Sequence, residues 1–113
     1  AVPLVQGTIR YAHKVERIPT SAEKEAAEGA VFAASVLPIV HDCNADDAKI
    51  IFDSMKVGAT KTDYLAVKKA FEKNYDCMGI TCKDVGGLWD GPNEKYYDDS
   101  SPCKDKSTSS SRS

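Results

Sequence analysis

Residues 20–40 read TSAEKEAAEGAVFAASVLPIV and predict the longest helix of the chain. Thr20 and Glu23 have the spacing of a capping box, in which each side chain satisfies a free backbone N–H group of the first turn. Pro38 lacks a backbone donor and is expected to kink or end this helix. The small and apolar residues between these ends recur with a period of 3.6 and form a broad face: Ala22, Ala26, Ala27, Ala30, Val31, Ala33, Ala34 and Leu37.

Working outward, the same periodicity and the capping residues predict two further helices, over 44–55 and about 62–75. A single helical turn is predicted at 81–85, and residues 88–103 are interpreted as an ordered loop. Residues 8–16 fit either a short helix or an edge strand, and the helix is the preferred interpretation. The sequence therefore predicts an all-α fold, a small disulfide-stabilised bundle of three main helices and a short N-terminal helix, with an ordered C-terminal loop.

The 113 residues are predicted to form one domain over 7–103, since single domains commonly contain ~100–150 residues. Residues 1–6 are predicted to be a flexible arm, and the Ser-rich residues 104–113 a disordered tail. The chain opens at Ala1 without an initiator Met, as expected after removal of a leader peptide.

Charge and composition exclude several classes of function. Fifteen basic and 17 acidic residues give a formal net charge of −2, which argues against a nucleic-acid-binding protein. No apolar run approaches the ~20 residues that cross a bilayer, so no membrane span is predicted. Phosphate-binding loops and nucleophile-base pairs are not recognisable in the sequence, and we predict that the chain is not an enzyme.

The four cysteines are predicted to form disulfides. Only Cys77 and Cys82 have a spacing that resembles a zinc ligand pair, so zinc is the weaker alternative. If the helices over 44–55 and 62–75 form an antiparallel hairpin, Cys43 before the first lies beside Cys77 after the second. Cys82 is then left for Cys103. Two disulfides indicate an oxidising compartment, and we predict a secreted, cell-surface or lumenal protein.

Two groups of side chains are candidate metal ligands. His13 and Glu16 are three residues apart and would share one face of a helix. The second group is a run of hard oxygen donors that suits ferric iron, Tyr96, Tyr97, Asp98 and Asp99. The alternative for both groups is an ordinary surface, with the carboxylates in water and the tyrosines packed on the bundle.

Two further features have simpler interpretations. His41 and Asp42, near Asp46 and Asp47, also collect possible ligands, but acidic residues at a helix start are favoured by the helix dipole. Trp89 is the only tryptophan and is interpreted as a hydrophobic plug that holds the terminal loop on the helices.

Three stretches of the chain resemble a known family. They are AAEGAVFAASVLP at 26–38, DYLAVKKAF at 63–71 and YDCMGITCKDVGG at 75–87. Together they resemble the low-iron-inducible periplasmic proteins of algae, the family of the iron-assimilating proteins and the diatom phytotransferrins. The resemblance covers about residues 7–90 and implies a secreted or surface-held protein that takes part in iron uptake.

Two functions are therefore predicted. The first is a non-enzymatic domain outside the cytosol that binds a metal, directly or as part of an uptake assembly, with the cofactor left open and ferric iron as the candidate. The alternative is a structural or assembly subunit of an extracellular appendage, wall or lumenal complex, without a metal site. The alternative depends on the helix over 20–40, where Gly29 and the alanines would let another chain pack closely.

Overall fold

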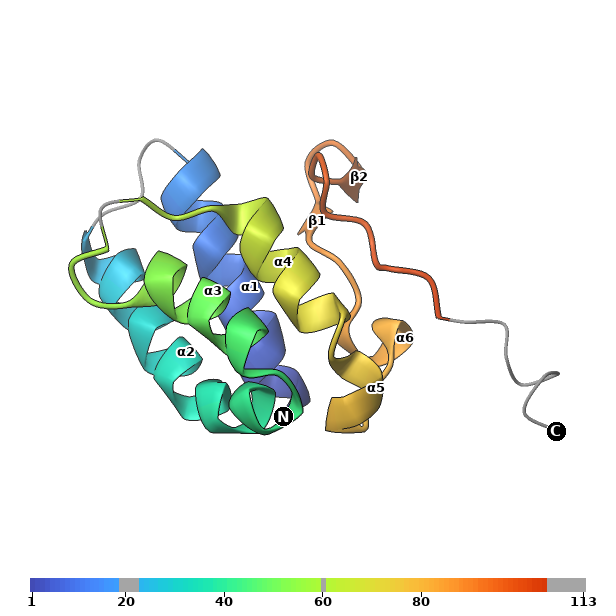
Figure 1. The fold of residues 1–113 in the computed structure, drawn as a ribbon. Helices are drawn as coiled ribbons and strands as arrows, with labels where there is room; N and C mark the ends of the chain where they lie inside the picture. The colour runs from blue at the N-terminus through green and yellow to red at the C-terminus, as the bar shows by residue number, and fades with distance from the viewer. Residues whose placement is uncertain (19–22, 60, 106–113) are drawn as a thin grey trace, which may run out of the picture.

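The computed structural model describes residues 1–18, 23–59 and 61–105, and its fold is all-α, as predicted (Figure 1). The bundle consists of four helices, α1 (Val2–Arg17), α2 (Glu23–Cys43), α3 (Ala45–Met55) and α4 (Tyr64–Glu72). Two single-turn helices and a two-stranded antiparallel hairpin follow, α5 (Tyr75–Met78), α6 (Cys82–Val85), β1 (Trp89–Asp90) and β2 (Lys95–Tyr96).

Helix α1 begins at Val2, so the prediction of a flexible arm over 1–6 is wrong. The prediction of a helix over 8–16 is confirmed, but the helix is 16 residues long. Pro3 lies in its first turn, where the fixed φ of proline favours a helix and the missing N–H is not needed. Val5 is completely buried in the core, and this packing holds the first turns in place.

Helix α2 extends beyond the predicted end at residue 40. It runs through Pro38 to Cys43, so of the two expected effects of the proline, a kink or a stop, the stop does not occur. Val36 and Val40, on either side of Pro38, are completely buried. Their burial offsets the ~3 kcal/mol that an internal proline costs. The predicted cap Thr20 lies outside the described residues.

The predicted helix over 44–55 is confirmed, and Asn44 caps α3 by accepting the Asp47 N–H at 3.0 Å. The predicted helix over 62–75 is instead divided between α4 and α5. At the break, the Asn74 side chain donates to the Ala70 carbonyl at 2.7 Å. A side chain that takes a backbone acceptor in this way competes with the helical hydrogen bonds, which accounts for the interruption.

The predicted turn over 81–85 is confirmed as α6, with a capping box between Thr81 and Asp84. The predicted tail over 104–113 is wrong at its start, because Asp105 is part of the folded domain. The Asp105 carboxylate accepts the N–H groups of Cys82 and Lys83 at 2.7 and 3.2 Å. Residues 106–113 lie outside the described part of the chain.

The region predicted as a loop over 88–103 contains the β-hairpin, in which Trp89 is opposite Tyr96. The Asp90 carboxylate closes its turn by accepting from the Asn93 side chain at 2.7 Å. Trp89 is 56% exposed and packs its edge against Tyr96, so the prediction of a buried plug is wrong.

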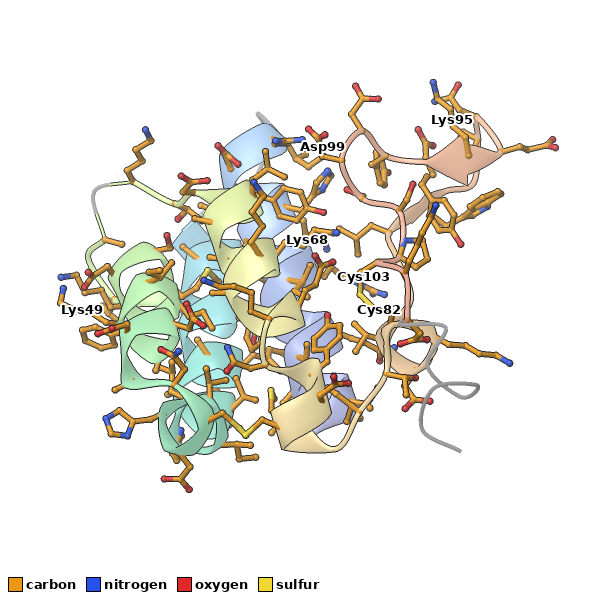
Figure 2. The ribbon with its side chains drawn as sticks, turned by 45° about the vertical axis from the view of Figure 1, so that its right-hand side comes forward. Lys49, Lys68, Cys82, Lys95, Asp99 and Cys103 are labelled. Carbon is orange, nitrogen blue, oxygen red and sulfur yellow. A yellow bond between two sulfur atoms is a disulfide. The ribbon has the colours of Figure 1, made fainter. Side chains whose placement is uncertain are left out.

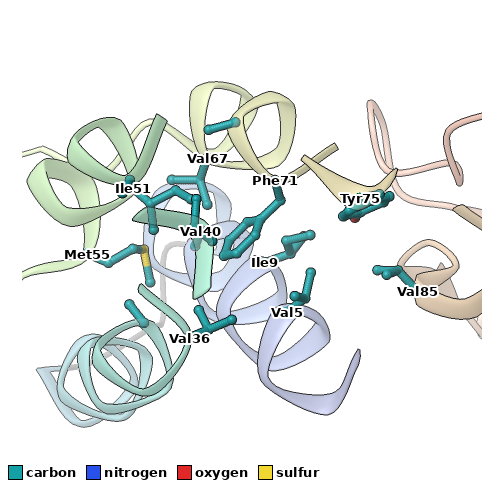
Figure 3. Close-up of a cluster of buried hydrophobic side chains, with 14 of the residues drawn as sticks. Val5, Ile9, Val36, Val40, Ile51, Met55, Val67, Phe71, Tyr75 and Val85 are labelled. Carbon is teal, nitrogen blue, oxygen red and sulfur yellow. The ribbon is translucent and has the colours of Figure 1, made fainter. Parts of the chain in front are cut away.

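All six helices contribute to one hydrophobic core (Figure 3). The residues labelled there are Val5, Ile9, Val36, Val40, Ile51, Met55, Val67, Phe71, Tyr75 and Val85. Gly29 marks a close approach between helices. A Cβ atom at Gly29 would lie 2.9 Å from the Tyr11 Cβ of α1 and 2.8 Å from the Met55 Cε of α3. The close approach predicted at this glycine is therefore made within the chain.

Both predicted disulfides are present, Cys43–Cys77 and Cys82–Cys103 (Figure 2). The first ties the end of α2 to α5, and the second ties α6 to the segment after the hairpin. Within the described residues no cysteine is free. Such a pattern indicates an oxidising environment.

A buried polar network joins α3 to the end of α4. Asp47 is 4% exposed, and its carboxylate accepts from the Lys73 ammonium and the Asn74 amide, both at 2.9 Å. Burial by itself raises the pKa of Asp47, but the hydrogen bonds from Lys73 and Asn74 outweigh it, and the net pKa is lowered.

A carboxylate with a lowered folded-state pKa stabilises the protein above its unfolded-state pKa, ~3.9, and this stabilisation is lost as the pH falls through the folded-state pKa. We expect Asp47→Asn to lower the free energy of unfolding at pH 7 by about 1–2 kcal/mol. The difference from the wild type should shrink below pH ~4. Urea unfolding between pH 2 and 7 measures it. Asp46→Asn, an exposed neighbour, is the control, and an equal effect of both substitutions would contradict the assignment.

Candidate functional site

The residues predicted as metal ligands come together at the C-terminal end of α1. His13 and Glu16 lie on α1, and Tyr97, Asp98 and Asp99 directly follow β2. Figure 2 shows Asp99 beside this end of α1. Tyr96 is part of β2 and pairs with the exposed Trp89 instead. The two predicted groups are therefore neighbours in space, although about 80 residues separate them in the sequence.

A cation already occupies the centre of this cluster, namely the side chain of Arg17. Its Nη1 atom lies 3.2 Å from the Asp99 carboxylate and donates to the Asp98 carbonyl at 3.2 Å. Its Nε atom is 3.5 Å from the Glu16 carboxylate. The guanidinium also lies over the Tyr64 ring, 4.9 Å from the centroid. Arg17 thus pairs with two of the carboxylates predicted as metal ligands, those of Glu16 and Asp99.

Tyr64 connects the cluster to the core. Its N–H donates to the Glu16 carboxylate at 2.9 Å. Its hydroxyl is 2.7 Å from the Ser100 Oγ and donates to the Asp99 carbonyl at 3.2 Å. Tyr64 and Ser100 are completely buried. Glu16 and Asp99 therefore have structural partners and hold the segment after β2 on the bundle.

His13 is 5% exposed and lies between two aromatic rings. The ring centroids of Tyr64 and Tyr97 are 5.1 and 4.8 Å from that of His13. Burial lowers the pKa of His13, and the Arg17 charge lowers it further, against the opposing effect of Glu16. His13 is therefore neutral at pH 7 and serves as a packed aromatic side chain.

The other predicted cluster, around His41 and Asp42, does not assemble. Both side chains are exposed, and so is Asp46, whereas Asp47 is committed to the network with Asn74. Across residues 1–18, 23–59 and 61–105, no group of three His, Cys, Asp or Glu side chains is placed to hold a metal ion.

Binding of ferric iron by Tyr96, Tyr97, Asp98 and Asp99 stays a prediction, and the position of Arg17 changes its expected outcome. To bind Asp99, a ferric ion would have to displace the guanidinium of Arg17, which is also positively charged. Titration with ferric citrate, monitored by visible absorption, is therefore expected to give no tyrosinate-to-iron band. A band that appears with the wild-type protein and disappears in Tyr97→Phe would instead confirm the prediction from the sequence.

A second surface feature is a groove between α2 and the end of α3. The sequence predicted only its α2 side, as the face of small and apolar residues over 20–40. We call it the α2–α3 groove, and it has a volume of about 390 Å³. The residues that line it are Ala30, Ala33, Ala34, Leu37, Phe52, Met55, Lys56 and Val57. Lys56 is the only charged residue among them. Val57 is 85% exposed and Phe52 47% exposed.

By length and composition alone, helix α2 could cross a membrane over Glu25–Cys43, and the absence of a membrane span stays a prediction. This is weak evidence, because core helices and signal sequences have the same length and composition. Of this window, 28% is buried inside the bundle. Cys43, at its end, is bonded to Cys77 of α5, so α2 is an integral part of the folded domain.

The chain matches no family model, and no curated protein or solved structure is significantly similar to it. The resemblance to the low-iron-inducible proteins therefore stays a prediction from the three stretches of sequence. The contacts and exposed surfaces of the described residues are therefore the basis of the proposed function.

Proposed function

We propose that this protein is a non-enzymatic assembly subunit of an oxidising compartment outside the cytosol, such as the cell surface or an organelle lumen. In this proposal it packs against further copies of itself through the α2–α3 groove. The observation that carries the proposal is the set of exposed apolar side chains at this groove on a small disulfide-bonded domain. Apolar patches of this kind on soluble proteins commonly mark sites of protein association.

The shape of the surface supports pairing between two copies. Val57 and Phe52 protrude on one side of the groove, and Ala30 and Ala34 leave room on the other. In a two-fold pair, the protruding side chains of each copy enter the groove of the other, as an isologous interface requires. Small residues on a helix permit the short interaxial distances at which such helices pack.

The chemistry of the groove agrees with this role. Interface centres are depleted of charged residues, and here only Lys56 carries a charge. The Lys56 ammonium lies over the Phe52 ring, 5.6 Å from its centroid, at the edge of the apolar surface. Val31, the next residue of α2 after Ala30, is a further exposed apolar side chain of this helix, at 68%.

Sedimentation velocity over a range of protein concentrations tests the proposal. We expect the apparent mass to rise from 12.2 kDa toward twice that value for the wild type and to stay at the monomer value for Val57→Glu. Tyr96→Glu adds the same charge at an exposed apolar residue of the hairpin and should associate like the wild type. A wild type that remains monomeric at millimolar concentration would refute the proposed assembly.

A further inference from the structure

A cleft of about 720 Å³ lies between α1 and the segment that leads into and out of the hairpin. Its volume is within the range of small-molecule sites, ~300–1,000 Å³. Arg10, His13 and Lys14 of α1 line one side, and Leu88, Trp89 and Tyr97 line the other. The proposed assembly makes no use of this cleft.

The cationic side of the cleft has two charges available for a ligand. Arg10 is exposed, and neither Arg10 nor Lys14 forms an ion pair with a carboxylate among the described residues. The Lys14 ammonium instead lies 5.3 Å from the centroid of the Tyr11 ring. Among the described residues that line the cleft, Glu25 is the one carboxylate, so their formal charge is +1, with His13 neutral.

The opposite side is mainly apolar. Trp89 is 56% exposed although the hairpin is well connected to the bundle, and its ring stands edge-on to Tyr96, 5.1 Å between centroids. Tyr97 of this side packs against His13, 4.8 Å between ring centroids. Exposed indole and phenol rings beside cationic side chains are suited to ligands that combine an apolar body with a negative charge.

The position of the apolar side is held by the covalent and polar contacts of the C-terminal segment. Leu88 donates its N–H to the Ser100 carbonyl at 2.9 Å, and Tyr97 donates its N–H to the Leu88 carbonyl at 3.0 Å. The Cys82–Cys103 disulfide and Arg17 attach the same segment to the bundle. A site with walls held in this way loses little conformational entropy when a ligand binds.

We propose that this cleft binds a small organic anion with a flat apolar body. Arg10 and Lys14 hold the charged end, and Leu88, Trp89 and Tyr97 contact the body. The ligand needs both its charged end and its apolar body. Two solvated cations by themselves bind a simple anion weakly, and the apolar side of the cleft by itself does not select for charge.

Three probes separate the two parts of this recognition. 8-Anilinonaphthalene-1-sulfonate carries the aromatic body and the charge, N-phenyl-1-naphthylamine has the body without the charge, and inorganic sulfate has the charge without the body. Trp89 is the only tryptophan, so energy transfer from its indole to a bound naphthalene reports binding beside it. We expect transfer and saturable binding with the sulfonate, about tenfold weaker binding of the neutral probe, and no competition by sulfate at its own concentration.

Variants of the intact chain locate the site. Arg10→Gln/Lys14→Gln should bind the sulfonate about tenfold more weakly. Lys61→Gln/Lys69→Gln removes the same charge from exposed positions elsewhere and should bind like the wild type. Far-UV circular dichroism and urea midpoints verify that both variants are folded.

Three results would overturn the inference. One is equal affinity of the Arg10→Gln/Lys14→Gln and Lys61→Gln/Lys69→Gln variants for the sulfonate. Another is equal affinity of the wild type for the charged and the neutral probe. The third is binding without energy transfer that Val57→Glu abolishes, since the probe would then occupy the α2–α3 groove. Sedimentation of the same proteins tests the proposed assembly separately. A failure of ligand binding at the cleft is therefore distinguishable from a failure of self-association.

Discussion

Replacing Cys43 and Cys77 together by serine is expected to lower the free energy of unfolding by about 4 kcal/mol. The bridge spans 34 residues, and the loss of chain entropy in the unfolded state grows with the length of the closed loop. Stabilities of single domains are ~5–15 kcal/mol, so this one bridge supplies a large share. Urea unfolding followed by far-UV circular dichroism measures the change.

The second bridge provides the matched comparison. Cys82–Cys103 spans 21 residues, and its replacement by two serines should cost about 3 kcal/mol on the same model. It should also release the hairpin segment that carries Trp89, whereas loss of Cys43–Cys77 should leave the fluorescence of the folded protein unchanged. A loss below ~1 kcal/mol for the Cys43–Cys77 variant would show that packing already holds α5 to α2.

Phe71→Ala is expected to destabilise the fold by about 3–5 kcal/mol. Phe71 is completely buried and is surrounded by side chains from several helices, among them Ile9 and Val40 (Figure 3). Its removal leaves a cavity that the disulfide-bonded bundle fills only in part, so the cost exceeds the lost transfer free energy.

The chain supplies its own control in Phe52, which is 47% exposed at the α2–α3 groove. Phe52→Ala should change the free energy of unfolding by less than ~1 kcal/mol and should weaken association instead. Equal urea midpoints for the two alanine variants would contradict the placement of Phe71 at the centre of the core.

Features that depend on neighbours in the sequence were predictable. The capping residue Asn44 was predictable because a cap needs only a side chain two or three residues before the N–H that it accepts. The pairing of Cys43 with Cys77 followed from one further assumption, that consecutive helices pack antiparallel.

Features that depend on distant segments were not predictable. Arg17 was overlooked because its partners Asp98 and Asp99 are more than 80 residues away. The division of the helix over 62–75 was missed because Asn74 bonds both within α4 and across to α3. Trp89 was likewise predicted to be a plug between the terminal loop and the helices, but the short hairpin leaves it 56% exposed.

The sequence by itself determined that this protein is a small disulfide-bonded helical domain, because helix periodicity, caps and cysteine spacing act over short stretches of chain. Only the tertiary structure decided which charge lies among the predicted ligand oxygens, and that charge belongs to Arg17. It also decided which residues of α2 are buried and which stay exposed. Both outcomes depend on how the helices and the terminal segment pack, because an ion pair or an exposed face arises between elements that the local pattern describes only one at a time.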